Sequence, residues 1–354
     1  MYAMNLFDAV DFADHEEICH FHDREAGLRA IIAIHNTRLG PAVGGCRMWN
    51  YASEGEALAD ALRLSQGMTF KAAMADLPLG GGKSVIWGDP RTQKSPSLFR
   101  AFGRAVESLK GRYYTGEDVG TTPADMAVAG RETRFVLGRD EQGSSGDPSP
   151  DTADGVLMAI EGAARHKLGA SDLAGLRVAV QGLGNVGMAL AGRLFEGGAE
   201  LVVADIDKAR VAEAESRFGA RSVPVGDIPA VECDVFAPCA LGAVINDETL
   251  PRLRCGIVAG SANNQLHRPE HGDRLHERGI LYTPDFVANA GGLINIAQEA
   301  LSPAYDSERT RNHLPIIRRR LQQIFERSAA TGTPPHRIAD SMAREIVEGQ
   351  RAAA

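Results

Sequence analysis

The sequence predicts an α/β protein of two domains, and three features of the chain support that prediction. Short apolar or β-branched runs alternate with amphipathic stretches along most of the chain, an order typical of α/β domains. The 354 residues can bury two cores. A helix-breaking stretch at 143–150, with two glycines, three serines and two prolines, provides a boundary. We therefore assign residues 1–142 to a first domain and 147–330 to a second.

The first domain is expected to contain three strands and three helices. The strands are predicted at 28–34, 84–87 and 112–115, and the helices at 54–74, 97–109 and from 123 onward. Ser53 is a plausible N-cap, with Glu56 completing a capping box, and Pro123 suits a first helical position.

The second domain repeats a strand–helix order. Strands are predicted at 176–181, 200–205, 233–237, 256–260 and 279–282, and helices at 185–196 and 290–302. This order predicts a doubly wound sheet. A final amphipathic helix is expected at 337–348 and could pack back on the first domain.

Composition argues against several classes of protein. The net charge of −8 gives no reason to expect nucleic acid as a partner, and no apolar run has the length of a membrane span. The N-terminus does not resemble a secretory leader. Five scattered cysteines without a C-x-x-C pair indicate reduced thiols and a cytoplasmic location. His267, His271 and His276 lie close in sequence but lack a completing ligand, so we expect no metal site.

A glycine fingerprint, Gly182-Leu183-Gly184-Asn185-Val186-Gly187, follows a predicted strand and opens a predicted helix. In this context the glycines allow a tight turn, close approach of a pyrophosphate to the backbone, and close helix–strand packing. The second domain is therefore predicted to be a Rossmann-type dinucleotide-binding domain. The alternative is a strand–helix turn that binds no nucleotide.

Asp205 ends the next predicted strand and can accept hydrogen bonds from ribose hydroxyls, which favours NAD over NADP. Lys208 and Arg210 are near enough in sequence to weaken that preference. Asn263 and Asn289 follow later strands and are expected at the same ligand-binding edge, although either could simply belong to a loop.

Two lysines and an acid predict chemistry in the first domain. Gly80-Gly81-Gly82 is expected to form a bare backbone turn ahead of Lys83, and Lys71 lies near the end of a helix. A desolvated lysine near a second cation should have a lowered pKa and can act as a base. Asp118 follows Lys83 by 35 residues. Ordinary surface lysines, and an Asp118 that caps the helix near Thr122, are the alternatives.

These motifs resemble the glutamate/leucine/phenylalanine/valine dehydrogenase family, most closely its branched-chain and aromatic members. The resemblance extends over nearly the whole chain through 39–49, 67–71, 80–83, 117–122, 182–187, 262–266 and 289–292. It implies reversible oxidative deamination of an L-2-amino acid by NAD and water to a 2-oxo acid, ammonium and NADH. It also implies an active site in a cleft between the two domains, and a homo-oligomer.

The resemblance further implies roles for single residues. Lys83 is the base that activates water, and Asp118 shuttles protons. Lys71 binds the substrate carboxylate with help from the backbone of Gly44 and Gly45. Asn263 touches both substrate and nicotinamide, and is a cofactor residue together with Asn289.

The resemblance implies a side-chain pocket formed by Val43, Gly116, Leu293 and Ile296. Because the pocket has no charge to pair with a second carboxylate, glutamate is disfavoured. Glycine at 116 with leucine at 293 resembles a phenylalanine-type pocket. We expect large apolar substrates, with phenylalanine slightly ahead of leucine, valine and isoleucine. The alternatives are a leucine or branched-chain dehydrogenase proper, and a non-catalytic NAD-binding regulator.

Overall fold

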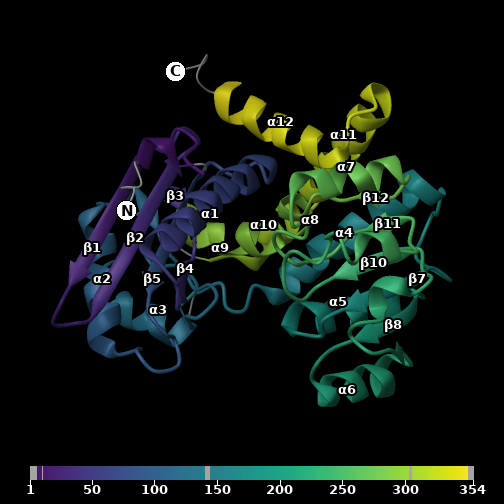
Figure 1. Cartoon of the computed structure of the whole chain (residues 1–354), viewed down its shortest axis with the longest axis horizontal. Helices are drawn as coiled ribbons and strands as arrows, with labels where there is room; N and C mark the ends of the chain where they lie inside the picture. The colour runs from purple at the N-terminus through teal and green to yellow at the C-terminus, as the bar shows by residue number, and fades with distance from the viewer. Residues whose placement is uncertain (1–5, 10, 140–143, 303–304, 350–354) are drawn as a thin grey trace. The chain divides into compact units, whose positions relative to one another are not determined.

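The computed structural model describes residues 6–9, 11–139, 144–302 and 305–349 of the chain. These residues form two compact units (Figure 1). Unit 1 comprises Met1–Asp147, Ile296–Ser307 and Ala343–Ala354, and unit 2 comprises Pro148–Asn295 and Glu308–Met342. Among the described helices, none is long and apolar enough to cross a membrane.

Unit 1 is built on a mixed sheet with the strand order β1-β2-β5-β3-β6, and β4 also pairs with β5. The strands are β1 (Glu17–Asp23), β2 (Leu28–Asn36), β3 (Ala42–Val43), β4 (Cys46–Trp49), β5 (Gly80–Trp87) and β6 (Tyr113–Tyr114). The helices and short turn of this unit are η1 (Leu6–Asp8), α1 (Glu54–Met74), α2 (Pro96–Ser108) and α3 (Pro123–Ala129). β2 is antiparallel to both its neighbours, whereas β3 and β4 run parallel to β5.

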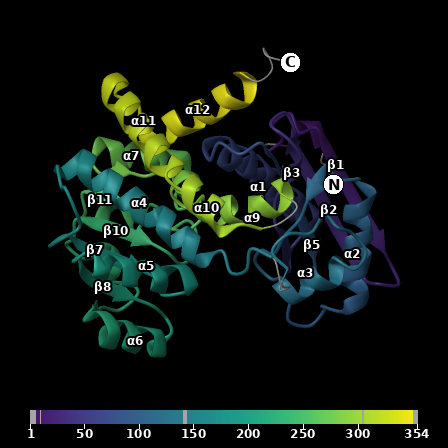
Figure 2. The same ribbon diagram turned by 180° about the vertical axis from the view of Figure 1, so that it is seen from behind.

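Helices cover both faces of this sheet, as the two opposite views show (Figures 1 and 2). Ile32 and Ile34 of β2 join the core formed with α2 and α3, whereas Ile31 and Ala33 join the core formed with α1. Since successive side chains of a strand point to opposite faces, a strand buried on both sides must be apolar throughout. This explains the continuous apolar run that predicted the strand.

The triple glycine belongs to a strand, so the expectation of a bare turn ahead of Lys83 is wrong. β5 begins at Gly80, and its glycines lie where other segments approach the backbone closely. A Cβ on Gly81 would stand 2.0 Å from the Thr69 nitrogen, and one on Gly82 would stand 2.7 Å from the Tyr113 ring. Contacts from distant parts of the chain, rather than turn geometry, therefore require glycine here.

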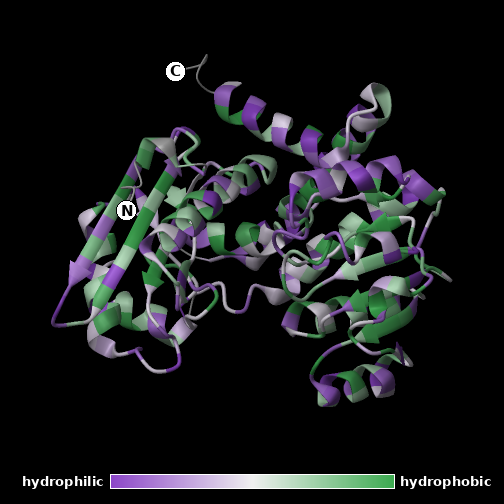
Figure 3. Ribbon diagram, viewed as in Figure 1, coloured by the Kyte–Doolittle hydropathy of each residue, from purple (hydrophilic) through white to green (hydrophobic). Residues whose placement is uncertain are grey.

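Unit 2 contains a parallel sheet with the strand order β12-β11-β10-β7-β8-β9. Its strands are β7 (Arg177–Gln181), β8 (Glu200–Ala204), β9 (Arg221–Ser222), β10 (Val235–Pro238), β11 (Ile257–Val258) and β12 (Leu281–Tyr282). Counted from β7, this is the order 3-2-1-4-5-6 of the dinucleotide-binding Rossmann fold. The predicted doubly wound sheet is confirmed. Figure 3 shows the strands β7, β8 and β10 as largely hydrophobic.

The helices and short turns that complete the chain are α4 (Ser149–Leu168), α5 (Asn185–Glu196), α6 (Lys208–Phe218), η2 (Ile228–Ala230), η3 (Leu250–Arg252), α7 (Pro269–Glu277), α8 (Asp285–Ala288), α9 (Gly291–Leu301), α10 (Ser307–His313), α11 (Ile316–Thr331) and α12 (Pro335–Gly349). Helices and short turns lie between the strands of the unit 2 sheet, and the helices α8 to α12 follow its last strand, β12. The sequence did not predict α4, which begins inside the helix-breaking stretch.

Two C-terminal segments do not follow the expected division of the chain into two domains at 143–150. Residues 296–307 were expected in the second domain but belong to unit 1. Within that unit, the Glu299 carboxylate accepts hydrogen bonds from the backbone N–H groups of Gly138 (2.9 Å) and Ser145 (2.5 Å). The last helix, α12, is divided at 342/343, and the guanidinium of Arg344 lies 5.1 Å from the centroid of the Phe70 ring.

Candidate active site

Lys83 and Asp118 form a buried ion pair in unit 1. The Nζ atom of Lys83 lies 2.6 Å from Oδ2 of Asp118, and the two side chains are 7% and 21% exposed. Lys83 is held in β5, opposite Ala33 of β2. Asp118 is fixed by Thr121, whose hydroxyl accepts a hydrogen bond from the Asp118 N–H at 3.0 Å. The predicted lysine and acid are therefore in direct contact.

Helix capping does not account for Asp118. The N-cap of α3 is Thr122, whose hydroxyl accepts a hydrogen bond from the N–H of Asp125, and Asp125 completes the capping box. Asp118 instead faces two cations, Lys83 and Arg47. Burial alone would raise the pKa of Asp118, but these two positive charges outweigh it and hold the pKa well below its usual range. The carboxylate is therefore ionised throughout the neutral range.

Arg47 is a charged residue at this site to which the sequence interpretation gave no role. Its Nε lies 3.1 Å from Oδ2 of Asp118, and its Nη1 lies 2.9 Å from Oδ2 of Asp60. Tyr51 donates its hydroxyl to the same Asp60 oxygen at 2.8 Å. Arg47 stands in the glycine-rich motif at 39–49, which was the only signal in the sequence that could have found it.

Gly44 and Gly45 bring bare backbone to the acid. A Cβ on Gly45 would stand 2.9 Å from Cβ of Asp118, and one on Gly44 would stand 1.7 Å from the Gly82 carbonyl oxygen. The Gly44 carbonyl accepts a hydrogen bond from the Tyr113 hydroxyl at 2.5 Å. No side chain larger than hydrogen fits at either position, so the backbone lies beside the Lys83–Asp118 pair.

Lys71 lies in the last turn of α1 and is half-buried. Two residues earlier, Thr69 meets β5 at Gly81, so this end of the helix is packed against the strand that carries Lys83.

The four residues expected to form the side-chain pocket lie on β3, in the loop after β6, and on α9. Val43 is buried in β3 between Gly81 and Tyr114. Gly116 precedes Asp118 by two residues, and among the described residues a Cβ built on it meets only the Leu137 carbonyl oxygen, at 3.5 Å. Leu293 and Ile296 are one turn apart on α9 and so share a face of that helix.

The fingerprint of unit 2 has the geometry of a nucleotide turn. Gly182 has φ +95°, and a Cβ on Gly187 would stand 2.0 Å from the Gly182 carbonyl oxygen. Around Gly184 the space is open, since the nearest atom to a Cβ there is 3.8 Å away. Gly184 is also the N-cap of α5 and provides no side chain to its first N–H groups. These features fit a bound pyrophosphate.

Asp205 follows β8 beside this turn and accepts hydrogen bonds from the Leu183 N–H (2.5 Å) and the Asp207 N–H (2.8 Å). Arg210 is directed to the Leu183 carbonyl at 2.9 Å. A carboxylate next to the turn suits ribose hydroxyls and repels a 2′-phosphate, so the residues fit NAD.

Asn263 and Asn289 are hydrogen-bonded to each other in unit 2. Nδ2 of Asn289 donates to Oδ1 of Asn263 at 2.7 Å and to the Ser261 carbonyl at 3.0 Å. Oδ1 of Asn289 is buried and has no hydrogen-bond partner among the residues that the structure describes. A buried amide oxygen of this kind calls for a donor, and the carboxamide of a nicotinamide carries one.

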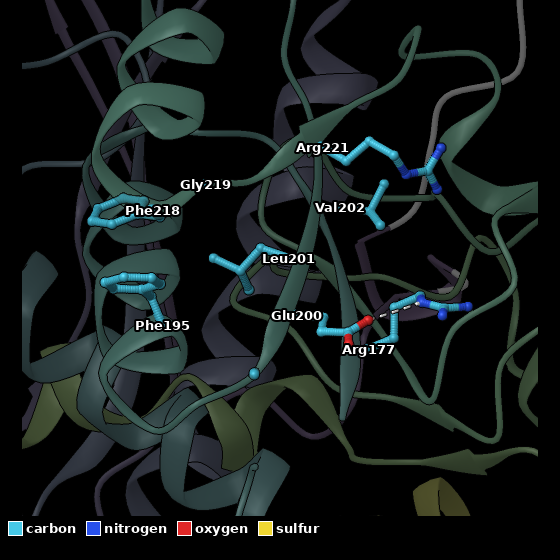
Figure 4. A pocket seen from close by; sticks show the side chains of 9 residues that line it. Arg177, Phe195, Glu200, Leu201, Val202, Phe218, Gly219 and Arg221 are labelled. Carbon is cyan, nitrogen blue, oxygen red and sulfur yellow. Dashed lines mark ion pairs between the residues drawn. The ribbon is translucent and has the colours of Figure 1, made fainter. Parts of the chain in front are cut away.

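A hollow of about 640 Å³ lies at the amino ends of three strands of the unit 2 sheet (Figure 4). It is lined by Arg177, Glu200 and Arg221, which begin β7, β8 and β9, and by Phe195 and Phe218, whose rings lie on the side of Leu201 in Figure 4. Since the fingerprint follows the carboxyl end of β7, this hollow is not the nucleotide site. The residues that the structure describes contain no cluster able to hold a metal ion.

Comparison with known proteins identifies the family. Residues 15–135 match the Glu/Leu/Phe/Val dehydrogenase dimerisation domain, and residues 203–348 match the glutamate/leucine/phenylalanine/valine dehydrogenase model. A leucine dehydrogenase of Geobacillus stearothermophilus is 52% identical over 99% of this chain and 95% of its own length. The chain belongs to the Glu/Leu/Phe/Val dehydrogenase family. It is an amino-acid dehydrogenase, an oxidoreductase that acts on a CH–NH2 group and uses NAD.

Other members of the family are similarly close. A phenylalanine dehydrogenase of Lysinibacillus sphaericus is 46% identical over 96% of this chain and 90% of its own. The crystal structure of an L-tryptophan dehydrogenase from Nostoc punctiforme superposes with a TM-score of 0.84 at 41% identity, covering 96% of this chain and 97% of that one. These relatives span leucine, phenylalanine and tryptophan dehydrogenases, so the family alone does not select the amino acid.

Proposed function

We propose that this dehydrogenase deaminates large apolar L-amino acids, with phenylalanine ahead of leucine, at a site organised by Lys83 and Asp118. The observation that supports it most is the 2.6 Å contact between Nζ of Lys83 and Oδ2 of Asp118 in a nearly buried setting. A base and an acid in direct contact can exchange the protons that imine hydrolysis requires.

Each residue has one task in this proposal. Lys71 binds the substrate carboxylate, and the backbone at Gly44 and Gly45 keeps the neighbouring space free of side chains. NAD, held at the 182–187 turn and by Asp205, would supply the acceptor for the hydride of the substrate Cα. Lys83 takes a proton from the water that attacks the resulting iminium carbon, and the Asp118 carboxylate accepts that proton from Lys83 and passes it to the nitrogen. Ammonium and the 2-oxo acid are then released.

The proposed substrate class follows from the residues at the expected pocket. None of the expected pocket residues is charged; they are Val43, Gly116, Leu293 and Ile296. The side-chain carboxylate of a bound glutamate would therefore be buried without a partner, which is costly. This disfavours glutamate. Because residue 116 is glycine, a space about the size of a methyl group remains between its Cα and the Leu137 carbonyl oxygen. This additional space suits a planar ring.

A leucine dehydrogenase proper is the second candidate. It is favoured by the 52% identity to the Geobacillus stearothermophilus leucine dehydrogenase over nearly the full length of both chains. Apolar pockets discriminate weakly, by roughly 1–3 kcal/mol per methylene, so both substrates are expected to react.

Reductive amination tests the proposal directly. NADH oxidation would be followed with ammonium and one of three acids: phenylpyruvate, 4-methyl-2-oxopentanoate or 2-oxoglutarate. We expect turnover of the first two, a higher kcat/KM for phenylpyruvate, and little turnover of the third. A higher kcat/KM for 4-methyl-2-oxopentanoate would select the second candidate. Preferred turnover of 2-oxoglutarate would overturn the pocket assignment.

We also propose that the protein is a homo-oligomer in the cytoplasm. The match of residues 15–135 to a dimerisation domain supports the first statement, and five free cysteines support the second. Light scattering after gel filtration would measure the molar mass against 37.7 kDa for one chain. A mass of one chain at micromolar concentration would contradict the oligomer.

A further inference from the structure

Arg47 bridges two carboxylates in unit 1. Its Nε contacts Oδ2 of Asp118 at 3.1 Å, and its Nη1 contacts Oδ2 of Asp60 at 2.9 Å. The same Asp118 oxygen accepts the Lys83 ammonium at 2.6 Å. Two cations therefore converge on one carboxylate oxygen, and the reaction proposed above uses only one of them.

We propose that Arg47 is a positioning residue for the deamination: it holds the Asp118 carboxylate in place and favours its return to the ionised form after each proton transfer, whether Lys83 is charged or neutral. The inference rests on the proposed roles of Lys83 and Asp118. Arg47 does not touch the reacting atoms in this scheme, because it acts through Asp118.

The argument begins with the charge balance of the pair. When Lys83 acts as a base it is neutral, and Asp118 then has no charge opposite it on that side. A carboxylate that is only 21% exposed would tend to take up a proton under those conditions. A guanidinium does not lose its proton in proteins, so Arg47 supplies a positive charge that persists through the cycle. The positive charge that stabilises the ionised form of Asp118 therefore does not depend on the protonation state of Lys83.

The orientation of Arg47 is fixed from the other side. Asp60 belongs to α1, has a side chain that is 12% exposed, and receives the Arg47 Nη1 together with the Tyr51 hydroxyl at 2.8 Å. Arg63 holds the second Asp60 oxygen at 3.0 Å. A planar guanidinium can meet two carboxylates at once, whereas the single ammonium of a lysine cannot do so in the same geometry.

Further ionisable groups lie within electrostatic reach of Asp118. They are Cys46, Tyr51, Tyr113 and Glu117. Burial raises the pKa values of Cys46 (to about 12), Tyr51, Tyr113 and Glu117. Near neutral pH the thiol and both phenols are uncharged, so the nearest fixed positive charge besides Lys83 is that of Arg47.

The test compares the pH profiles of kcat/KM for Arg47→Gln and Asp60→Asn. Removing the positive charge favours proton binding by neighbouring groups. Arg47→Gln should therefore shift the acid limb of the kcat/KM profile to higher pH, by about one pH unit or more. Removing the negative charge of Asp60 should move that limb down or leave it in place. In both variants kcat should fall roughly 10- to 100-fold through lost positioning, with little change in KM. A purely structural role would not shift the limb to higher pH in Arg47→Gln without a similar shift in Asp60→Asn.

Arg91→Gln is the matched control, because it removes the same charge from a side chain that is 88% exposed. Its profile should match that of the wild type. An Arg47→Gln limb at the wild-type position, in a variant of unchanged Tm, overturns the inference. If Arg47→Gln does not fold, Arg47→Lys decides: a lowered kcat with a near wild-type limb supports the inference, and wild-type kcat overturns it. If the wild type turns over no amino acid, or Asp118→Asn remains fully active, the proposed function fails instead.

Discussion

Gly116→Ala adds one methyl group at the proposed pocket and should reverse the preference for a ring. The new Cβ meets only the Leu137 carbonyl oxygen, at 3.5 Å, an ordinary contact, and Gly116 has no positive φ. The variant should therefore fold with nearly wild-type stability. Since a methylene in an apolar pocket is worth roughly 1–3 kcal/mol, the phenylalanine-to-leucine ratio of kcat/KM should fall by about 5- to 150-fold.

The assay is NAD reduction with phenylalanine and with leucine, each over a range of concentrations. Gly162→Ala provides the control, because Gly162 lies within α4 and a Cβ there meets no atom within 4 Å. That variant should keep the wild-type ratio and gain up to about 1 kcal/mol of stability from lower chain entropy. An unchanged ratio in Gly116→Ala, with Tm preserved, would show that residue 116 does not line the side-chain pocket.

Three other predictions concern the buried pair and the cofactor. Lys83→Met should lower kcat by about 10²–10⁴-fold while NAD binding, measured by calorimetry, stays unchanged, and a loss below tenfold would exclude Lys83 as the base. In urea unfolding, Asp118→Asn should cost about 3 kcal/mol at pH 7. The folded-state pKa of Asp118 is below the unfolded value of about 3.9. The difference in unfolding free energy between wild type and Asp118→Asn should therefore be constant above about pH 4 and shrink on further acidification. A constant difference down to about pH 2 would contradict an ion-paired Asp118. Asp205→Ala should reduce the NAD-to-NADP preference in Kd, and an unaltered preference would show that Asp205 does not select the cofactor.

Most of the predictable features of the fold rest on local patterns of residues adjacent in sequence. The turn at 182–187 is local, because its strand, glycines and helix follow one another, and the structure confirms the surrounding Rossmann-type sheet. The apolar run of β2 is likewise a local pattern that reports burial on both faces. By contrast, the triple glycine looked like a turn because its reason lies in Thr69 and Tyr113, which approach from other elements.

The chain by itself determined the order of the motifs, the alternation of strands and helices, and the presence of two lysines and an acid. Only the tertiary structure decided that Arg47 shares an oxygen of Asp118 with Lys83, and that residues 296–307 belong to unit 1. The physical reason is distance along the chain. Arg47 and Asp118 are 71 residues apart, and a sheet with parallel crossovers brings them together. No periodicity or spacing in the sequence encodes which charges meet there.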